Sequence, residues 1–114
     1  MHNNGTPIRN WLHANDTASA VITIIESGVK NEIYNICGGF EQTNLETIKK
    51  ILDVNKLDTS NLSKYIDFSC NRVGQDVRYA LDDTKIKSLG WNPMKQFDEE
   101  IPKIVQYYKD RFIW

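Results

Sequence analysis

A predicted strand, a glycine pair and a capped helix follow one another in the stretch Tyr34-Asn35-Ile36-Cys37-Gly38-Gly39-Phe40-Glu41-Gln42-Thr43-Asn44-Leu45-Glu46. The alternation over residues 32–37 predicts the strand, and Gly38-Gly39 ends it. Thr43 with Glu46 three residues later is a capping box, which predicts that a helix begins here. Helix N-termini offer N–H groups to anions, and glycine lets a ligand approach the backbone. The stretch predicts an anion-binding turn or an ordinary strand-to-helix turn with a good cap. The pattern alone favours the ordinary turn.

The first two predicted helices are amphipathic. Asn15 and Asp16 supply the N-cap of the first, and Gly28 ends it. The second begins at the Thr43 capping box. Their apolar stripes, at helical spacing, are Ala18, Val21, Ile22 and Ile25, and Leu45, Ile48, Ile51 and Leu52.

Two further helices are predicted near the C-terminus. Asp82 or Asp83 caps a short one that ends at Gly90, after which Trp91 folds back on it. The last begins near Asp98, and Pro102 is compatible with it only in about the first turn. Its apolar positions are Phe97, Ile101, Ile104, Val105, Tyr108 and Phe112.

Extended segments separate the helices. Residues 8–12 predict a strand or an extended entry, residues 32–37 and 65–70 predict strands, and residues 77–80 predict a short extended piece. Residues 54–64, rich in Asn, Asp and Ser, predict a loop. The fold class is therefore α/β, with about four helices and two or three short strands.

Composition narrows the function classes. A chain of 114 residues predicts one small domain, and 14 basic against 15 acidic residues argue against a nucleic-acid partner. No apolar run approaches the roughly 20 residues of a membrane span, and no secretion signal is evident. Cys37 and Cys70 lack the spacing of a zinc site. Reduced thiols in a cytoplasmic protein are favoured over a disulfide between them.

Three arginines are candidate phosphate ligands. Arg9 lies in the first extended segment, and Arg72 and Arg78 follow the predicted strand at 65–70. An arginine at a strand end can clamp phosphate through its planar fork of donors, although a single arginine is more often a solvated surface charge. Asn44, in the first turn of the second helix, can add a side-chain amide.

Catalytic motifs are missing from the sequence. It contains no Gly-x-Gly-x-x-Gly fingerprint, no Tyr followed four residues later by Lys, no Gly-x-Ser-x-Gly elbow and no P-loop. His2 and His13 lack useful partners in sequence. The acidic run Asp98-Glu99-Glu100 is interpreted as negative charge at the start of the last predicted helix. We therefore assign no catalytic residue and no metal ligand.

Four blocks, in family order, resemble the C-terminal part of dTDP-glucose 4,6-dehydratases. They are Ile8-Arg9-Asn10-Trp11-Leu12-His13-Ala14-Asn15-Asp16-Thr17-Ala18, Tyr34-Asn35-Ile36-Cys37-Gly38-Gly39 with Asn44-Leu45-Glu46, Asn71-Arg72-Val73-Gly74-Gln75-Asp76-Val77-Arg78-Tyr79-Ala80, and Ile86-Lys87-Ser88-Leu89-Gly90-Trp91-Asn92-Pro93. The third block points more narrowly to the dehydratases than the others do.

The resemblance implies an NAD-dependent epimerase/dehydratase of the extended short-chain dehydrogenase/reductase type. In such enzymes a larger Rossmann lobe carries NAD and the Tyr-x-x-x-Lys pair, and a small C-terminal lobe holds the nucleotide diphosphate. The sugar is oxidised at C4, water leaves from C5 and C6, and hydride returns to C6. By matched position, residues 1–114 form the small lobe, and Arg9, Asn44 and Arg72 contact the diphosphate and nucleoside.

Some positions depart from the family pattern. Gln75, assigned to the substrate site, replaces a His and can form hydrogen bonds but carries no charge. Val73 replaces a Pro and His13 a Tyr, and Cys37 stands where a Gly is expected or is an added small residue. Arg78 is expected to have a structural role with Asp76. These departures leave the base and the sugar undetermined.

The expected partners are a nucleotide diphosphate sugar and a Rossmann lobe, on a separate chain or in a longer protein. This chain itself is expected to bind no cofactor, to have no turnover alone, and to expose an apolar patch where the other lobe docks. The alternatives are the same lobe from a UDP-sugar epimerase or decarboxylase, and a non-catalytic module that binds a sugar nucleotide or a protein.

Overall fold

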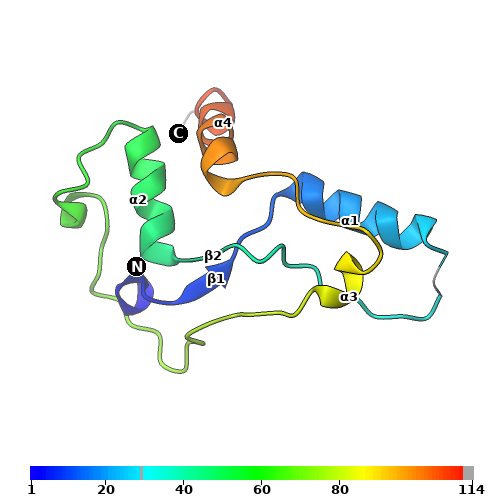
Figure 1. The fold of residues 1–114 in the computed structure, drawn as a ribbon. Coiled ribbons are helices and arrows are strands. Elements are labelled where there is room, and N and C mark those ends of the chain that lie inside the picture. Colours follow the sequence, from blue (N-terminus) through cyan, green and yellow to red (C-terminus); the bar gives the residue numbers. More distant parts are fainter. Residues whose placement is uncertain (29, 112–114) are drawn as a thin grey trace.

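The computed structural model describes residues 1–28 and 30–111 (Figure 1). The four α-helices and one two-stranded sheet found in these described ranges confirm the predicted α/β class. The elements are η1 His2–Gly5, β1 Ile8–Asn10, α1 Ala14–Glu26, β2 Glu41–Thr43, α2 Asn44–Val54, η2 Leu62–Lys64, α3 Thr84–Lys87 and α4 Phe97–Lys109. Within the described ranges, no helix has the length and apolar character needed to cross a membrane.

The elements form two groups (Figure 1). In the first, called the sheet half, β1 and β2 pair antiparallel with Arg9 opposite Gln42, and α2 packs against α4, β2 and η1. In the second, called the α1 half, α1 and α3 enclose a small core together with the extended segment 30–37. That core consists of Ala20, Ile86 and Trp91, with Leu12, Ile24, Tyr34 and Ile36 packed around it.

The molecule is elongated for its length. Its radius of gyration is 17.1 Å and its extents are 51 × 36 × 22 Å, whereas a compact chain of this size would have a radius of about 13 Å. The excess arises because four crossover segments, rather than a shared core, join the two halves: from β1 to α1, from segment 30–37 to β2, from η2 to α3 and from α3 to α4. Surface that a compact domain would bury is therefore exposed.

The N-cap of α1 differs from the prediction. The helix begins at Ala14, so Asn15 and Asp16 lie inside its first turn, and the Nδ1 atom of His13 accepts the hydrogen bond from the Asn15 N–H at 3.0 Å. Asp16 is buried, and its carboxylate accepts hydrogen bonds from the backbone N–H groups of Met94 and Lys95, each at 3.0 Å. Asp16 thus ties α1 to the crossover before α4.

Two predicted strands are wrong. Residues 32–37 and 65–70 have no strand assignment, although the first segment was expected to alternate in burial. Ile33 is 85% exposed, and no neighbouring strand is available in the described part of the chain. The sheet uses residues 41–43 instead. Among the described residues, the extended piece at 77–80 pairs only through one parallel bridge between Arg78 and Ile8.

The two short-range predictions for α3 and α4 are partly correct. The Asp82 carboxylate accepts a hydrogen bond from the Thr84 N–H at 2.8 Å, while Asp83, at the N-cap position, makes no capping bond. Trp91 packs against Ile86 as expected. Pro102 is the sixth residue of α4 and not in its first turn, and the helix nevertheless continues to Lys109. Phe112 lies outside the described residues.

Candidate functional site

Arg9 is held by backbone carbonyls and an aromatic ring. Its Nη1 donates to the Ile8 carbonyl at 2.7 Å, and both Nη1 and Nη2 donate to the Asp76 carbonyl, at 3.3 and 3.2 Å. The guanidinium carbon lies 4.3 Å from the ring centre of Tyr79, a cation–π distance. These contacts fix Arg9 between β1 and residues 76–79.

Tyr79 lies at the centre of this cluster. Its hydroxyl donates to the Asp76 carboxylate at 2.6 Å. That hydrogen bond, and then the charge of the carboxylate, raise the pKa of Tyr79, while the positive charges of Arg9 and Arg72 act in the opposite direction. Of these two arginines, Arg9 is the one that contacts the Tyr79 ring.

The backbone of Arg72 is fixed by hydrogen bonds, whereas its guanidinium group is unpaired among the described residues. Its N–H donates to Asn3 Oδ1 at 2.9 Å, and its carbonyl accepts a hydrogen bond from Asn3 Nδ2 at 3.3 Å. Its guanidinium makes no hydrogen bond or ion pair to any residue in the described part of the chain. Asn3 has no predicted role, because its contact with Arg72 spans 69 residues.

Asn44 begins α2, but the start of this helix is not an open anion cradle. The Asn44 N–H donates to the Pro7 carbonyl at 3.1 Å, and the Glu46 N–H donates to the Thr43 hydroxyl at 3.1 Å. The Glu46 carboxylate adds negative charge beside these donors. The confirmed capping box therefore favours the ordinary-turn interpretation.

Gln75 lies in the same loop as Arg72. Its Oε1 is buried and has no hydrogen-bond partner among the described residues. Buried polar atoms are usually paired, so this amide oxygen lacks a donor in the observed conformation. Gln42, directly opposite Arg9, has a second buried oxygen without a partner, while its Nε2 donates to the Thr47 hydroxyl at 2.9 Å.

Arg78 has a structural role, but with a different partner from the predicted Asp76. Its Nη2 and Nε atoms donate to the Glu41 carboxylate at 2.7 and 3.0 Å. The hydrogen bond and charge of Glu41 raise the pKa of Arg78. The pair fastens residues 77–79 to β2. Since Glu41 follows the glycine turn on a strand that the sequence did not predict, this partner could not be anticipated.

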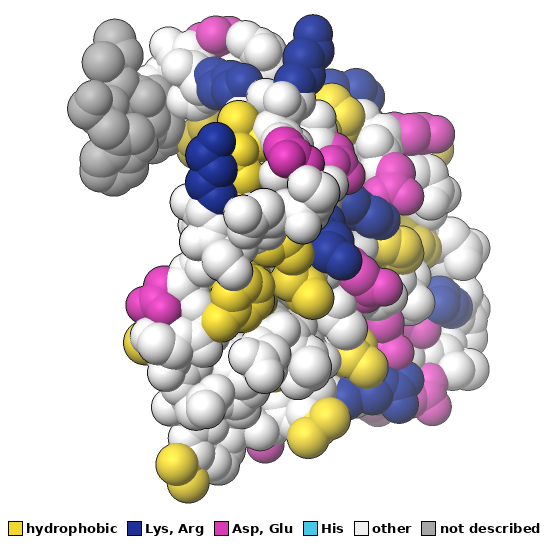
Figure 2. All heavy atoms as spheres, turned by 90° about the vertical axis from the view of Figure 1, so that its left-hand side faces the viewer, with side chains coloured by type: hydrophobic (Ala, Val, Ile, Leu, Met, Phe, Trp, Pro, Cys, Tyr) yellow, Lys and Arg dark blue, Asp and Glu magenta, His cyan; other side chains and the backbone are white. Residues whose placement is uncertain are grey.

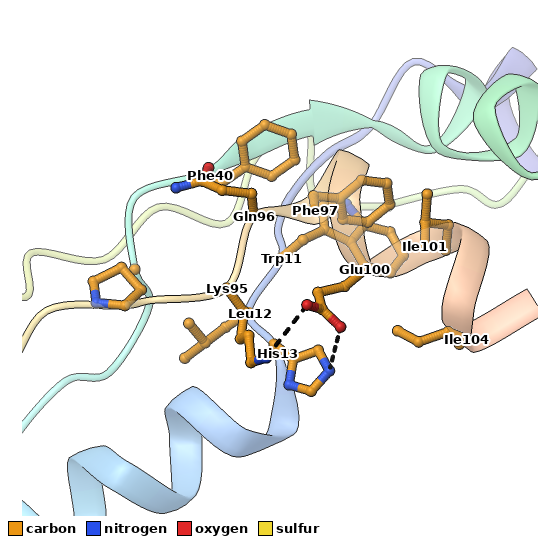
Figure 3. A pocket seen from close by; sticks show the side chains of 12 residues that line it. Trp11, Leu12, His13, Phe40, Lys95, Gln96, Phe97, Glu100, Ile101 and Ile104 are labelled. Atoms are coloured by element: carbon orange, nitrogen blue, oxygen red, sulfur yellow. Dashed lines mark hydrogen bonds and ion pairs between the residues drawn. The ribbon is translucent and has the colours of Figure 1, made fainter. Parts of the chain in front are cut away.

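A separate cavity of about 300 Å³ opens where the crossovers meet α4 (Figure 3). Aromatic rings line it, with Phe97 stacked on Phe40 and edge-on to Trp11. None of the four predicted site residues does so. Its one carboxylate, Glu100, is paired with lysines, and the hydrogen bond from Lys103 lowers its pKa. The cavity suits apolar groups rather than a diphosphate.

The face formed by α2 and the loop after it carries charges of both signs, interspersed with small apolar patches (Figure 2). Positive charge does not dominate this face, so it has no resemblance to a phosphate-backbone binding surface.

Known proteins resemble this chain over nearly its whole length. A family model described as GDP-mannose 4,6 dehydratase matches residues 1–104. The Low-salt glycan biosynthesis protein Agl12 of Haloferax volcanii is 36% identical over 108 residues, which cover 95% of this chain and 34% of that protein. The dTDP-glucose 4,6-dehydratase of Escherichia coli is 37% identical over 122 residues, covering 100% of this chain and 34% of that protein.

Solved structures agree. DesIV, the dTDP-glucose 4,6-dehydratase from Streptomyces venezuelae with NAD and TYD bound, superposes with a TM-score of 0.85 at 31% identity, covering 96% of this chain and 33% of that one. The UDP-glucose 4-epimerase of Thermotoga maritima, at 23% identity and a TM-score of 0.78, covers 96% of this chain and 34% of that one, and shares the fold. The chain thus spans about a third of the length of its relatives. It belongs to the GDP-mannose 4,6-dehydratase family of NAD-dependent epimerase/dehydratase proteins and corresponds to one part of an extended short-chain dehydrogenase/reductase fold.

Proposed function

We propose that this chain is the substrate-binding lobe of an enzyme resembling dTDP-glucose 4,6-dehydratase. In this role it holds the diphosphate and nucleoside of a nucleotide sugar with Arg9, Asn44, Arg72 and Gln75. The observation that carries the proposal is the guanidinium of Arg72, unpaired among the described residues, on the same loop whose Asp76 and Tyr79 fix the guanidinium of Arg9. The names of the relatives support the substrate class.

Each residue has a distinct part in binding. Arg72 pairs with phosphate oxygens through its planar fork of donors. Arg9 uses Nη1 and one Nη2 hydrogen for the carbonyls of Ile8 and Asp76, so its Nε–H and its remaining Nη2 hydrogen can face an anion. Gln75 accepts a hydrogen bond from a ligand hydroxyl or N–H once its side chain turns outward, because its Oε1 is buried in this structure. Asn44 supplies an amide that can donate or accept.

NAD would be held outside this chain. None of its six glycines forms a Gly-x-Gly-x-x-Gly turn, and Gly38-Gly39 leads into β2 rather than directly into a helix N-terminus. The residues present do not fit a dinucleotide, so oxidation, dehydration and reduction are assigned to another part of the enzyme. We expect no turnover from this chain alone.

We propose that the NAD-binding lobe, on a separate chain or in a longer protein, packs on α1. Val21, Ile22 and Ile25 form an apolar stripe on this helix and are 46%, 53% and 72% exposed. The extended segment 32–37 runs in the same half of the molecule without a neighbouring strand. An apolar helix stripe normally faces a core, and the elongated shape leaves this one uncovered.

Titration with dTDP, followed by NMR of backbone amides and arginine side chains, tests the binding proposal. We expect a dissociation constant in the high micromolar to millimolar range, about −4 to −6 kcal/mol, because one lobe supplies only part of the contacts. Shifts should centre on Arg9, Asn44 and Arg72. Shifts spread evenly over the surface would refute the site.

Charge-matched variants sharpen this test. Arg72→Gln should weaken dTDP binding about tenfold, since a charge-assisted pair to phosphate is lost. Lys49→Gln removes the same charge from an exposed position on α2 and should change binding less than twofold. Equal losses in the two variants would mean that only net charge matters, which contradicts a specific site.

The alternatives have their own readouts. Tighter binding of UDP than of dTDP would favour the lobe of a UDP-sugar epimerase or decarboxylase. Mixing the chain with a matching NAD-binding lobe and assaying for a 4-keto-6-deoxy sugar separates an enzyme lobe from a non-catalytic module. Restored turnover supports the former, and nucleotide binding without turnover supports the latter.

A further inference from the structure

Two consecutive asparagines at the start of the chain adopt the left-handed conformation, but they differ in what their side chains do. Asn3 and Asn4 have φ angles of 49° and 52°. The Asn3 side chain is partly buried and binds the backbone of Arg72. The Asn4 side chain is exposed and makes no hydrogen bond to any described residue. Asparagine tolerates this backbone region better than most residues.

The Asn3 amide grips both polar groups of a single peptide position. It accepts from the Arg72 N–H at 2.9 Å and donates to the Arg72 carbonyl at 3.3 Å. A neighbouring β-strand would make the same pair of bonds. The direction in which the Arg72 side chain leaves the backbone is therefore set by Asn3.

Asn3 is itself firmly placed. Its carbonyl accepts hydrogen bonds from the Thr6 N–H at 3.1 Å and the Thr6 hydroxyl at 2.9 Å. η1 packs against α2, where Gly5 is so close to Leu45 that an added Cβ would lie 2.9 Å from the Leu45 Cβ. The two hydrogen bonds between Asn3 and Arg72, called the clamp, thus connect the Arg72 backbone through η1 to α2.

The loop that carries Arg72 has few other attachments. Downstream it is held where the Ile8 N–H donates to the Val77 carbonyl at 2.8 Å and where Arg9 binds Asp76. Between these points Val73 is 98% exposed, and a Cβ placed on Gly74 would meet nothing within 4 Å. Without Asn3, the upstream end of the loop would lose the contact nearest to Arg72.

We propose that Asn3 is a positioning residue that fixes the backbone of Arg72, so that its guanidinium leaves a defined point of the loop that also binds Arg9, ready for a phosphate group. The proposal rests on the proposed function, in which Arg72 binds a nucleoside diphosphate. The clamp lowers the conformational freedom that Arg72 would otherwise lose when the ligand binds, and preorganisation of this kind increases affinity. An amide is required because Arg72 presents one donor and one acceptor together.

The adjacent asparagine provides a matched control. Asn3→Gly and Asn4→Gly both keep access to positive φ, but only the first removes the clamp. We expect Asn3→Gly to weaken dTDP binding about three- to tenfold, the effect of losing two ordinary hydrogen bonds, and Asn4→Gly to change it less than twofold. The Arg72 amide should lose protection from hydrogen exchange only in Asn3→Gly.

The Arg72→Gln background separates positioning from general damage. If Asn3 acts through Arg72, adding Asn3→Gly to Arg72→Gln should not weaken dTDP binding further. A full additional loss, or equal losses from Asn3→Gly and Asn4→Gly, would overturn the proposal. If Asn3→Gly fails to fold, Asn3→Asp against Asn4→Asp replaces the pair, since each adds one carboxylate and only the first places an oxygen against the Arg72 carbonyl.

Failure of the proposed function gives a different result. If Arg72→Gln itself leaves dTDP binding unchanged, Arg72 is not a ligand-binding residue and both proposals fall. If Arg72→Gln weakens binding while Asn3→Gly does not, the nucleotide site stands and only the positioning role of Asn3 is rejected.

Discussion

Thr43 and Glu46 fasten the first turn of α2 by exchanging hydrogen bonds. The Glu46 carboxylate accepts from the Thr43 N–H and hydroxyl, each at 2.7 Å. The backbone bond first, and then the hydroxyl, lower the pKa of Glu46. A lowered pKa in the folded state means that Glu46 stabilises the fold above its unfolded pKa of about 4.3 and that this contribution is lost as pH falls through the folded value.

Glu46→Gln is expected to flatten this acid dependence. Glutamine keeps the capping geometry but cannot titrate, so the variant should lose less stability than the wild type between about pH 5 and pH 3. Urea unfolding at several pH values measures the difference. Glu26→Gln removes an exposed carboxylate at the end of α1 and should leave the wild-type profile intact. An unchanged profile in Glu46→Gln would show that the capping box does not respond to acid.

Individual residues were predictable where their partners are close in sequence. The Thr43–Glu46 box, three residues apart, was identified from the pattern alone, and so was the return of Trp91 onto Ile86 after Gly90. The Asn3–Arg72 clamp and the Arg78–Glu41 ion pair join residues 69 and 37 positions apart. No local spacing encodes such contacts, because tertiary folding alone brings their partners together.

The structure contains the predicted helices but lacks two of the predicted strands, and the reason is specific to sheets. A helix satisfies its backbone within one segment, so its periodicity suffices to predict it. A strand needs a neighbour, and residues 32–37 keep an extended course without one. In contrast, Glu41–Thr43 lacks an apolar strand pattern but pairs with Ile8–Asn10 because the turn at Gly38-Gly39 delivers it there.

The exposed apolar stripe of α1 predicts how a substitution there affects association with the NAD-binding lobe. Ile25→Ser should leave the stability of the isolated chain nearly unchanged, because the side chain is already 72% exposed. It should weaken association with an NAD-binding lobe about tenfold, since a side chain buried at an interface contributes roughly 1.5–3 kcal/mol. Leu57→Ser, on the loop after α2, is the control and should associate normally. Analytical ultracentrifugation of the mixture measures both variants, and equal association of Ile25→Ser and wild type would place the docking surface elsewhere.

Taken whole, the molecule consists of two packed bodies joined by crossovers. The α1 half is organised around Ala20, Ile86 and Trp91, with the Trp91 Nε1 donating to the Ser19 hydroxyl at 2.9 Å. The sheet half relies on α2 against α4. The links between them are few, such as the edge-on contact of Trp11 with Phe97 and the 3.9 Å approach of His13 to Glu100. Weak coupling of this kind allows one half to open while the other stays folded.

This division predicts that a core mutation in one half leaves the other half protected. Ile86 is fully buried, so Ile86→Ala should cost about 2–4 kcal/mol and speed hydrogen exchange in α1 more than in α2. Leu52→Ala, at a buried position of α2, is the reciprocal variant and should speed exchange in α2 and α4 more than in α1. If both variants accelerate exchange equally everywhere, the chain unfolds as a single unit. Docking of the NAD-binding lobe on α1 would then affect the proposed substrate site only by raising the stability of the whole chain. If the predicted asymmetry holds, docking can order the α1 half while the residues proposed to hold the diphosphate remain in place.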